Sequence, residues 1–479
     1  METRQCKKCG LDFSLDGDDF NFYEKMDVPV PNICPDCRFK MRAIWRNETS
    51  LYSGRKCGLC QKNIVTMYNP KLPYVVYCNE CYRSDRWDAG FYKTDYDQSK
   101  PFFGQLGKLL VDVPKATTYA SLGSGSNINS DYVNQAGGLK NSYLVFNSGP
   151  GEEIMYSRGV RNSRDISDCY FGINLENCYE CVNVSESNHI FFGKNTFDSF
   201  NSSLVLNCRN INDCFCCVNL LNKSYCIFNK QLTREEYKKR LEEVIGSYSK
   251  MKEAQEKFNQ FSLQFPRREN NNLKTMDSTG DYLFECKDVK ESFEIARAEN
   301  CKYLFSSKEI KDSMGTIGYG FKSGMLLECV ATGYSSNVMG SYAVENSQNI
   351  FYSFQCRNCK DCIGCDGLRN VSYCILNKQY TKEKYEEIKT HIVEELREKD
   401  LYGLMMPVEL APFAYNETIA QDNMPLTKKE VLEQGFRWED DIQKTEGRET
   451  ILLKKRDRGF TYGSRSSITE YISVLLNLP

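Results

Sequence analysis

Cysteine pairs of the form CxxC crowd the first 81 residues of the chain, and they constrain its fold more than any other feature. A CxxC turn directs two thiolates at one point, and two such turns together build a closed tetrahedral cage that suits Zn²⁺. The spacing therefore predicts two four-cysteine sites that hold two zinc ions. The expected metal ligands are Cys6, Cys9, Cys34, Cys37, Cys57, Cys60, Cys78 and Cys81.

Two groupings of the four pairs are compatible with their spacing. The sequential grouping joins the first pair with the second and the third with the fourth, whereas a cross-braced grouping joins the first with the third. The sequential grouping is simpler and matches the usual spacing in zinc ribbons. In either case we expect the segment to fold only with metal. A core this small contributes about 3 to 5 kcal/mol, against about 10 to 16 kcal/mol from structural zinc.

The sequence around the first two pairs resembles a known family. The runs CKKCGLDF and FYEKMDVPVPNICPDCRFKMR, over about residues 4–43, look like the bacterial zinc-ribbon domains that share CxxCGxxF, a central FY and a CPxCR knuckle. The continuation WRNETSLYSGRKCGLC and YVVYCNECYRSDRWD is similar to uncharacterised bacterial proteins that join such ribbons to Cys-rich repeats. Neither resemblance implies an established activity. Together with the four cysteine pairs, the ribbon resemblance predicts a double zinc-ribbon module over residues 1–93.

Composition limits the compartment and the chemistry. The chain has 24 cysteines, two histidines and a net charge of −2, and it contains no apolar run of 18 residues. Because the cytosolic thiol pool opposes stable disulfides, we expect reduced thiols in a soluble, cytoplasmic protein without membrane contact. His189 and His391 are too few to favour a Ser-His-Asp or Cys-His catalytic device.

A basic stretch over residues 38–62 is the candidate nucleic-acid surface, since it has seven Lys or Arg against one acid, Glu48. Three arginines four residues apart would form one stripe on a helix, beside a tryptophan that can stack on a base. The expected nucleic-acid contacts are Arg38, Arg42, Trp45, Arg46, Arg55 and Lys56. The alternative is an ordinary solvated face with Trp45 in the core.

From about residue 120 the sequence becomes a series of short motifs in which Asn or Asp precedes Ser or Cys and then an aromatic residue. DCY at 168–170, NCY at 177–179 and DSF at 198–200 are examples. Neighbouring motifs lie about 9 to 15 residues apart, so alternate ones recur about every 20 to 25, the length of one coil of a parallel β-solenoid. We expect Asn and Asp at the corners, Ser, Cys and the rings pointing inward, and two-residue strand alternation.

An internal duplication organises the rest of the chain. Residues 207–237 align without gaps on 355–385, an offset of 148, with 18 of 31 positions identical. Each copy ends in NKQ and a helix, which Thr233 with Glu236 caps in the first copy and Thr381 opens in the second. The expected fold is mainly β. Its expected segments are a zinc module (1–93), a helical connector (94–119), a first β-solenoid (120–230), a helical segment (231–268), a second β-solenoid (280–380), a helix (381–406) and a C-terminal tail with a short helix (407–479).

The run Cys356, Cys359, Cys362 and Cys365 is typical of an iron–sulfur or an extra zinc site as well as of buried thiols. In the first copy Ile211 occupies the position of Cys359. Since a metal ligand is not freely replaced by isoleucine, the buried-thiol interpretation is favoured.

These features favour a non-catalytic zinc-binding scaffold that contacts nucleic acid through residues 38–62 or contacts another protein. A rival hypothesis is a carbohydrate-active β-helix enzyme, whose carboxylates would gather along one face. Aspartates do recur, but always just before the Ser or Cys of a motif, which suits hydrogen bonding at a corner. They are Asp168, Asp198, Asp213, Asp312 and Asp361. The partner and the oligomeric state stay open.

Overall fold

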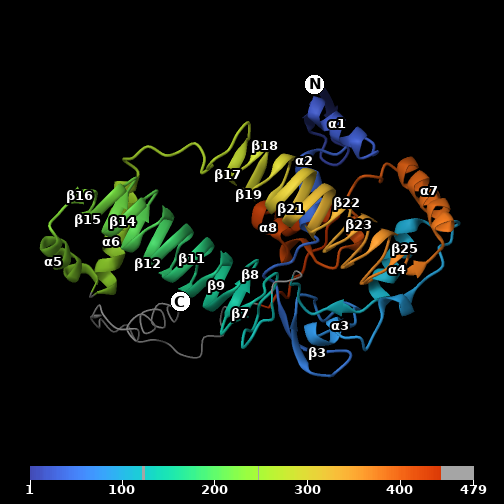
Figure 1. The fold of residues 1–479 in the computed structure, drawn as a ribbon, viewed down its shortest axis with the longest axis horizontal. Helices are drawn as coiled ribbons and strands as arrows, with labels where there is room; N and C mark the ends of the chain where they lie inside the picture. Colours follow the sequence, from blue (N-terminus) through green and yellow to red (C-terminus); the bar gives the residue numbers. More distant parts are fainter. Residues whose placement is uncertain (121–124, 246, 444–479) are drawn as a thin grey trace. The chain divides into compact units, whose positions relative to one another are not determined.

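The computed structural model describes residues 1–120, 125–245 and 247–443, and these residues are mainly β, as expected. They form two compact units, coloured along the sequence in Figure 1. Unit 1 comprises Met1–Thr118 and Asn270–Gln443, and unit 2 comprises Tyr119–Glu269. Each unit contains one large sheet in which parallel pairing predominates. The N-terminal cysteine segment therefore belongs to the same unit as the second repeat block.

Unit 1 begins with two small modules, each built of an antiparallel hairpin followed by helix. The elements of the first are β1 (Glu2–Gln5), β2 (Asp12–Leu15), α1 (Gly17–Lys25) and α2 (Pro35–Ala43). Those of the second are β3 (Tyr52–Lys56), β4 (Asn63–Thr66), β5 (Val76–Tyr77) and α3 (Asn79–Arg83). The connector that follows contains η1 (Ala89–Tyr92), α4 (Phe102–Asp112) and β6 (Lys115–Ala116), and β6 pairs in parallel with β5.

The large sheet of unit 2 is continuous from β7 to β16. Its strands are β7 (Leu139–Lys140), β8 (Tyr143–Phe146), β9 (Gly151–Arg161), β10 (Ser163–Ser167), β11 (Tyr170–Tyr179), β12 (Val182–Phe197), β13 (Phe200–Leu206), β14 (Arg209–Val218), β15 (Leu221–Ile227) and β16 (Lys230–Gln231). Only the last pair, β15 with β16, is antiparallel. The helices α5 (Arg234–Ile245) and α6 (Tyr248–Ser262) follow.

The sheet of unit 1 has the same plan. Its strands are β17 (Gly280–Phe284), β18 (Lys287–Lys290), β19 (Ser292–Ala296), β20 (Glu299–Lys302), β21 (Phe305–Gly333), β22 (Ser336–Met339), β23 (Gln348–Phe351), β24 (Lys360–Ile363), β25 (Ser372–Ile375) and β26 (Lys378–Gln379). After it come α7 (Lys382–Glu398), η2 (Val408–Leu410), η3 (Tyr415–Glu417), α8 (Ile419–Asn423) and α9 (Lys428–Glu433).

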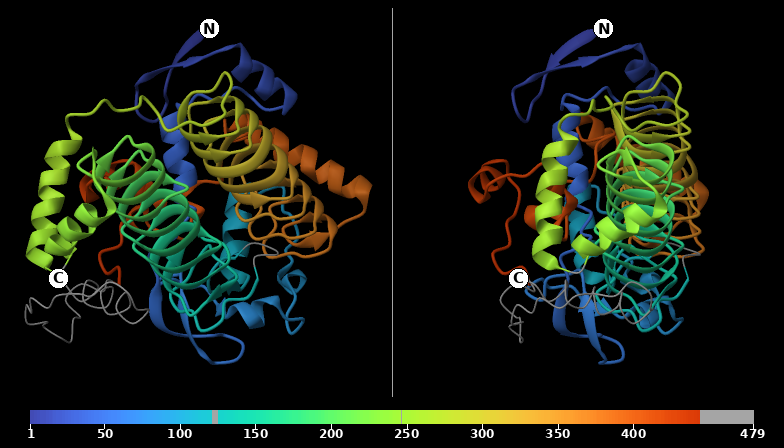
Figure 2. Two further views of the ribbon diagram at one scale, coloured as in Figure 1. Left: turned by 60° about the vertical axis from the view of Figure 1, so that its left-hand side comes forward. Right: turned by 90° about the vertical axis from the view of Figure 1, so that its left-hand side faces the viewer.

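The register of both sheets repeats every twelve residues. Arg164 pairs with Glu176 and Arg209 with Leu221 in unit 2, and Gln348 pairs with Lys360 in unit 1. Figure 2 shows the corresponding backbone, which advances in short stacked turns within each unit. The expected recurrence of 20 to 25 residues per turn is therefore wrong, because the register makes each turn about half that length.

A period of three, rather than the expected alternation of two, governs each turn. Every third residue of the repeats has a positive φ, as at Asp165 (51°) and Asp168 (53°). The residue that follows each of them points inward, and Ile166 and Cys169 are both 2% exposed. Four three-residue steps make one twelve-residue turn. Because the backbone bends at every third position, no strand side is long enough to alternate.

Serine and cysteine fill many inward positions, as expected, and they satisfy buried backbone groups. Ser353 Oγ accepts from the Cys365 N–H at 3.1 Å and donates to the Phe351 carbonyl at 3.0 Å. Cys359 Sγ donates to the Leu368 carbonyl at 3.4 Å. Amide side chains form similar ladders at the corners, twelve residues apart, with N···O distances of 2.9 and 3.1 Å along Asn183, Asn195 and Asn207. The interior thus combines an apolar core of Val, Ile, Leu and Cys with serine and cysteine side chains that hydrogen-bond to the backbone.

The helices after each sheet begin where the sequence indicates. Thr233 and Glu236 exchange capping hydrogen bonds before α5, and the Thr381 side chain accepts from the Lys384 N–H at the start of α7. In unit 2, Phe258 of α6 joins a buried cluster with Leu204 and other residues of the last turns. Within the ranges that the structure describes, no helix has both the length and the apolar character needed to span a membrane.

Candidate metal centres and their anchors

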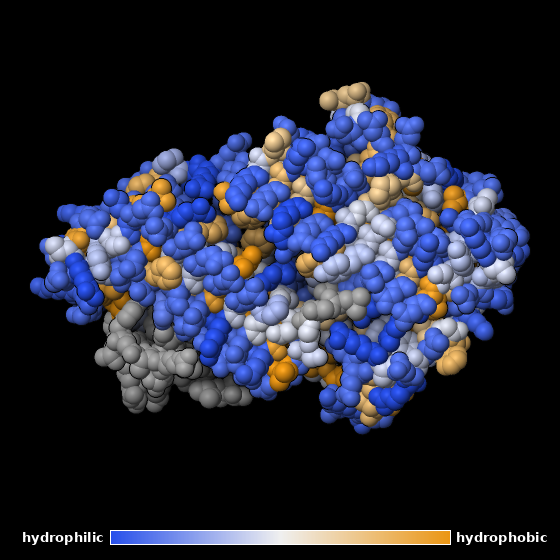
Figure 3. All heavy atoms as spheres, viewed as in Figure 1, coloured by the Kyte–Doolittle hydropathy of each residue, from blue (hydrophilic) through white to orange (hydrophobic). Residues whose placement is uncertain are grey.

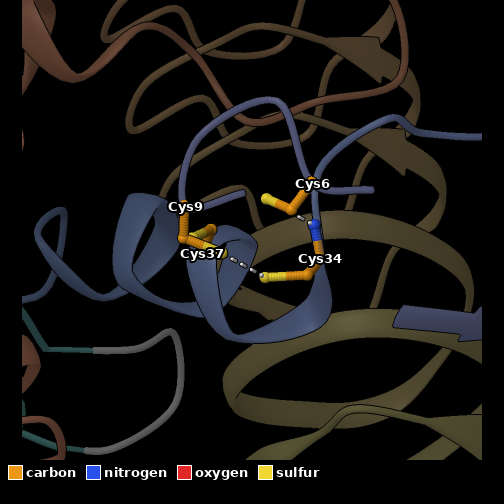
Figure 4. Close-up of side chains that lie close together, drawn as sticks. All are labelled: Cys6, Cys9, Cys34 and Cys37. Atoms are coloured by element: carbon orange, nitrogen blue, oxygen red, sulfur yellow. Dashed lines mark hydrogen bonds between the residues drawn. The ribbon is translucent and has the colours of Figure 1, made fainter. Parts of the chain in front are cut away.

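The first four-cysteine group is assembled by the first hairpin and α2. Cys6 and Cys9 lie in the turn between β1 and β2, Cys34 is the N-cap of α2, and Cys37 lies in its first turn. Figure 4 shows the four side chains directed toward one another, and their sulfur atoms all lie within 4.8 Å. Cys9 Sγ and Cys34 Sγ are 3.7 Å apart. A tetrahedral ion with metal–sulfur bonds of about 2.3 Å needs sulfur atoms about 3.8 Å apart, so the group fits such an ion.

The second group repeats this construction with the second hairpin and α3. Cys57 and Cys60 lie in the turn between β3 and β4, Cys78 is the N-cap of α3, and Cys81 lies within the helix. The four sulfur atoms again lie within 4.8 Å, with Cys60 Sγ 3.9 Å from Cys78 Sγ. The sequential grouping is therefore confirmed and the cross-braced one is excluded. The two groups can hold two metal ions.

One thiol in each group is prepared to act as a thiolate. Burial raises the pKa of Cys6, but backbone N–H donors, that of Cys34 foremost, outweigh it and lower the pKa to about 6. At Cys57 burial is outweighed in the same way by the N–H groups of Cys60 and Cys78, and the pKa is again about 6. A metal binds the deprotonated sulfur. With a pKa of about 6, these two thiols are mostly deprotonated at neutral pH before a metal binds.

The basic stripe predicted to contact nucleic acid lies in the interior of unit 1, which corrects the expectation that it faces solvent. Arg38 is 2% exposed, Arg42 1%, and Arg46 and Trp45 0%. The physical reason is that α2 packs on β21 of the large sheet instead of standing free. A cation without access to solvent cannot reach a phosphate, so these four residues are not available for such a contact in this fold.

Glu328 of β21 is the anion that pairs with two of the three buried arginines, whereas Arg46 pairs with Glu48. Arg38 Nη1 donates to Glu328 Oε1 at 2.9 Å and to the Tyr23 hydroxyl at 2.8 Å. Arg42 donates to the second carboxylate oxygen of Glu328. The Arg38 guanidinium also lies 5.8 Å from the centre of the Tyr303 ring. One carboxylate and one ring thus hold the helix that carries Cys37 against the large sheet.

Gly315 makes room for this contact. A Cβ atom built there would lie 2.9 Å from Glu328 Oε1 and 3.0 Å from Arg42 Nη1, and the φ angle is +61°. Both the left-handed backbone and the closeness of the guanidinium favour glycine at this position.

The other two predicted nucleic-acid contacts lie in β3. Arg55 is half-buried, and its guanidinium donates to the carbonyls of Asn69 and Leu72, each at 3.4 Å, and to that of Tyr74. Lys56 is exposed. Arg55 therefore fastens the loop after β4, and Lys56 is the one member of the predicted set that stands in solvent.

A second buried ion pair anchors the connector. Lys115 of β6 donates to Asp366, and their side chains are 2% and 0% exposed. Burial raises the pKa of Asp366 to about 6, although Lys115 opposes the rise. Sequence reasoning missed this pair and Glu328 because both anions lie more than 200 positions from their cations, and no local pattern links them.

The four cysteines of the CxxCxxCxxC run do not form a third metal group. They occupy the inward positions of one turn, at most 2% exposed, and donate to backbone carbonyls, as Cys365 does to Cys374 at 3.5 Å. Within residues 1–120, 125–245 and 247–443, the ligand atoms of His, Cys, Asp and Glu converge only in the two N-terminal groups. This arrangement supports the buried-thiol interpretation.

Comparison with known proteins leaves the chain without a family. No family model matches it, and no curated protein matches it. Among solved structures, a crystal structure of a candidate acetyltransferase from Desulfovibrio desulfuricans G20 aligns over 67% of this chain and 90% of its own, with 11% identity and a TM-score of 0.11. A likeness this weak carries no argument about fold or activity.

Proposed function

We propose that the chain is a non-catalytic scaffold in which two zinc ions fix the N-terminal modules to a β-solenoid, and that the paired β-solenoids bind a partner protein. The twelve-residue register that most strand pairs share supports the solenoid interpretation, because each turn then stacks its inward side chains on those of the next. The all-thiolate ligand sets support zinc, which accepts four sulfur ligands without a preference from d electrons.

The observation that carries this proposal is the direction in which the first module faces. Its helix α2 turns Arg38 and Arg42 inward onto Glu328, so the metal site stabilises an internal joint of unit 1. A module that served as a recognition surface would keep its charged side chains in solvent. The free energy of metal binding is instead available to hold a helix with buried charges on the sheet.

A protein partner is favoured over nucleic acid. Four of the six predicted contacts are buried, Arg55 fastens a loop, and the chain carries a net charge of −2. The enzymatic alternative has no support from the aspartates either. Asp312 accepts from Asn300 at 3.2 Å and Asp361 from Asn349 at 2.6 Å, each within its own corner ladder.

The test is to isolate complexes of the tagged full-length chain from cells, with and without nuclease. The proposal expects bound proteins that survive nuclease treatment. Complexes that require nucleic acid, and that weaken steeply with salt, would replace the proposal with the nucleic-acid version. Turnover of a polysaccharide by the purified chain would overturn the non-catalytic assignment.

A further inference from the structure

The internal duplication allows each position of unit 2 to be compared with its counterpart in unit 1. The offset of 148 between residues 207–237 and 355–385 extends back through the register of the two sheets. Tyr179 pairs with Phe191 in unit 2, and Leu327 pairs with Met339 in unit 1. Glu180 therefore occupies the position of Glu328, and their φ angles are 48° and 52°.

The ring that accompanies Glu328 also has a counterpart. Tyr303 lies two turns before Glu328. The second of these turns has thirteen residues instead of twelve, since the Leu326 N–H bonds to Ser313, thirteen positions earlier. Two turns before Glu180, through pairs that are all twelve apart, lies Tyr156. The two side chains of the large sheet that contact Arg38, Glu328 and Tyr303, thus have a glutamate and a tyrosine at the equivalent positions of unit 2.

The two faces differ in what covers them. Glu328 is 1% exposed beneath α2, whereas Glu180 is exposed and Tyr156 is 42% exposed. Met155, beside Tyr156, is 37% exposed. Figure 3 shows that hydrophilic residues predominate over the side of the molecule drawn there, with apolar residues in small groups. On unit 2 a tyrosine and a methionine therefore lie side by side in solvent, on the same face as the Glu180 carboxylate.

The chemistry of this face is suited to a cation on an amphipathic helix. Tyr143 and Tyr156 pack edge to face with ring centres 5.8 Å apart, which places two aromatic rings side by side on this face. The Tyr179 hydroxyl donates to Glu180 at 3.0 Å and holds the carboxylate at the surface. Asp168 occupies the position that Gly315 has in unit 1. The Arg42 side chain lies against Gly315 in unit 1, whereas unit 2 has a second carboxylate at this position. Guanidinium groups bind such pairs of carboxylates and rings through both charge and stacking.

We propose that the face of unit 2 formed by Tyr143, Met155, Tyr156, Asp168 and Glu180 binds an arginine-bearing helix of a partner protein, in the way that the equivalent face of unit 1 binds α2. This inference rests on the proposed scaffold function and specifies the partner class. Since α2 is committed to Glu328, with Arg38 only 2% exposed, the proposal assigns the place on unit 2 to a helix of another protein. Arginines four residues apart on the partner would match the spacing of Arg38 and Arg42.

The probe for this proposal is a fluorescein-labelled, alanine-rich helical peptide with two arginines four residues apart and leucines on the same face. A control peptide carries glutamine in place of both arginines. Fluorescence anisotropy with the zinc-loaded full-length chain is expected to give saturable binding of the first peptide only, weakening as salt rises.

Variants of the chain locate the binding site. The double substitution Tyr156→Ala with Glu180→Gln is expected to weaken peptide binding at least about tenfold. Glu186→Gln changes an exposed glutamate on another side of the same turns and should bind as the unchanged chain does. Because all three side chains are exposed in solvent, circular dichroism should confirm that both variants stay folded.

Three results would overturn the proposal: no saturable binding, equal binding by the double variant, or concentration-dependent self-association that the double variant abolishes, since a second copy would then occupy the face. None of them bears on the scaffold function. That function fails separately, if proteins leave the tagged chain after nuclease treatment.

Discussion

Arg38 donates to Glu328 across 290 positions of the chain, at 2.9 Å, and both side chains are almost wholly excluded from water. Taking charges out of water is costly, and one glutamate compensates two arginines here. The ion pair is therefore favourable only while its hydrogen-bond geometry is retained. Single substitutions at this contact should weaken the packing of the first metal module on the large sheet.

Glu328→Gln is expected to destabilise unit 1 by about 3 to 5 kcal/mol, because it leaves two buried guanidinium groups without a counter-charge. The measurement is urea unfolding followed by tryptophan fluorescence. All three tryptophans, Trp45, Trp87 and Trp438, belong to unit 1, so the signal reports this unit alone. Glu180→Gln, the equivalent change at an exposed position, should shift stability by no more than about 0.5 kcal/mol. Equal effects of the two changes would refute the role given to Glu328.

Metal analysis of the purified chain should find two zinc ions and no iron. Cys37→Ser is expected to reduce the zinc content to one and to lower the urea midpoint, since it opens the first cage next to Arg38. Cys359→Ser is the matched control, because serine already occupies the same inward line one turn earlier, at Ser347. This variant should keep two zinc ions, and a loss of metal from it would reveal a site inside the repeats.

Lys115→Met should destabilise unit 1 at neutral pH by about 3 to 5 kcal/mol, because it leaves the Asp366 carboxylate buried and unpaired. Burial holds the pKa of Asp366 at about 6, above its unfolded value of about 4. Because its pKa is raised in the folded state, Asp366 stabilises the fold at pH values below its unfolded-state pKa. This stabilisation is lost as the pH rises through about 6. The deficit of the variant should therefore shrink as the pH falls through the pKa of Asp366.

The first repeat block supplies the rescue of that variant. Val218 occupies the position of Asp366, and its N–H bonds to Asn229 at 2.8 Å just as that of Asp366 bonds to Asn377 at 2.8 Å. Lys115→Met combined with Asp366→Val should restore the urea midpoint to that of the unchanged chain or above, since an apolar pair replaces a buried ion pair. A double variant less stable than the single one would contradict this account.

Ser353→Ala tests the inward ladders. It removes the only acceptor that the structure assigns to the Cys365 N–H, so unit 1 should lose about 1 to 3 kcal/mol of stability. Ser353→Cys should lose less, because cysteines at such positions donate to the carbonyl two residues earlier, as Cys365 does to Ile363 at 3.5 Å. Amide hydrogen exchange at Cys365 gives a second readout, and slow exchange in the alanine variant would argue against the ladder.

Local signals in the sequence were sufficient for the metal groups and the helix starts. Cys6 and Cys34 could be joined correctly because CxxC turns have few productive partners at ribbon spacing, and Thr233 with Glu236 marks a helix start through its own hydrogen bonds. The orientation of α2 could not be foreseen. Three arginines four residues apart on one helix face are equally compatible with a solvent-exposed and a buried face. Nothing in the sequence indicates that Glu328 pairs with two of them.

The period of the repeats was present in the sequence but hidden by the size of the motifs. Ser142, Cys169, Cys178, Ser199 and Cys214 are all separated by multiples of three. The run Cys356, Cys359, Cys362 and Cys365 states the same period directly. The spacing of the recognisable motifs gave a longer recurrence, because many corners carry residues that are not typical turn formers. Phe171 and Leu204 are examples, although their φ angles are 59° and 54°.

The twelve-residue register restricts how such a chain can change in length. An insertion or deletion of twelve residues keeps each inward serine opposite the backbone N–H that donates to it. Most other deletions would move corner residues into inward positions. Two departures occur in unit 1: the first turn is one residue shorter, since Leu273 pairs with Phe284, and the step between Ser313 and Leu326 is one residue longer, where Gly315, Gly318 and Gly320 all have positive φ. Related chains should therefore differ in length mostly by whole twelve-residue turns, with other lengths confined to the first turn of a block or to glycine-rich stretches such as residues 315–320.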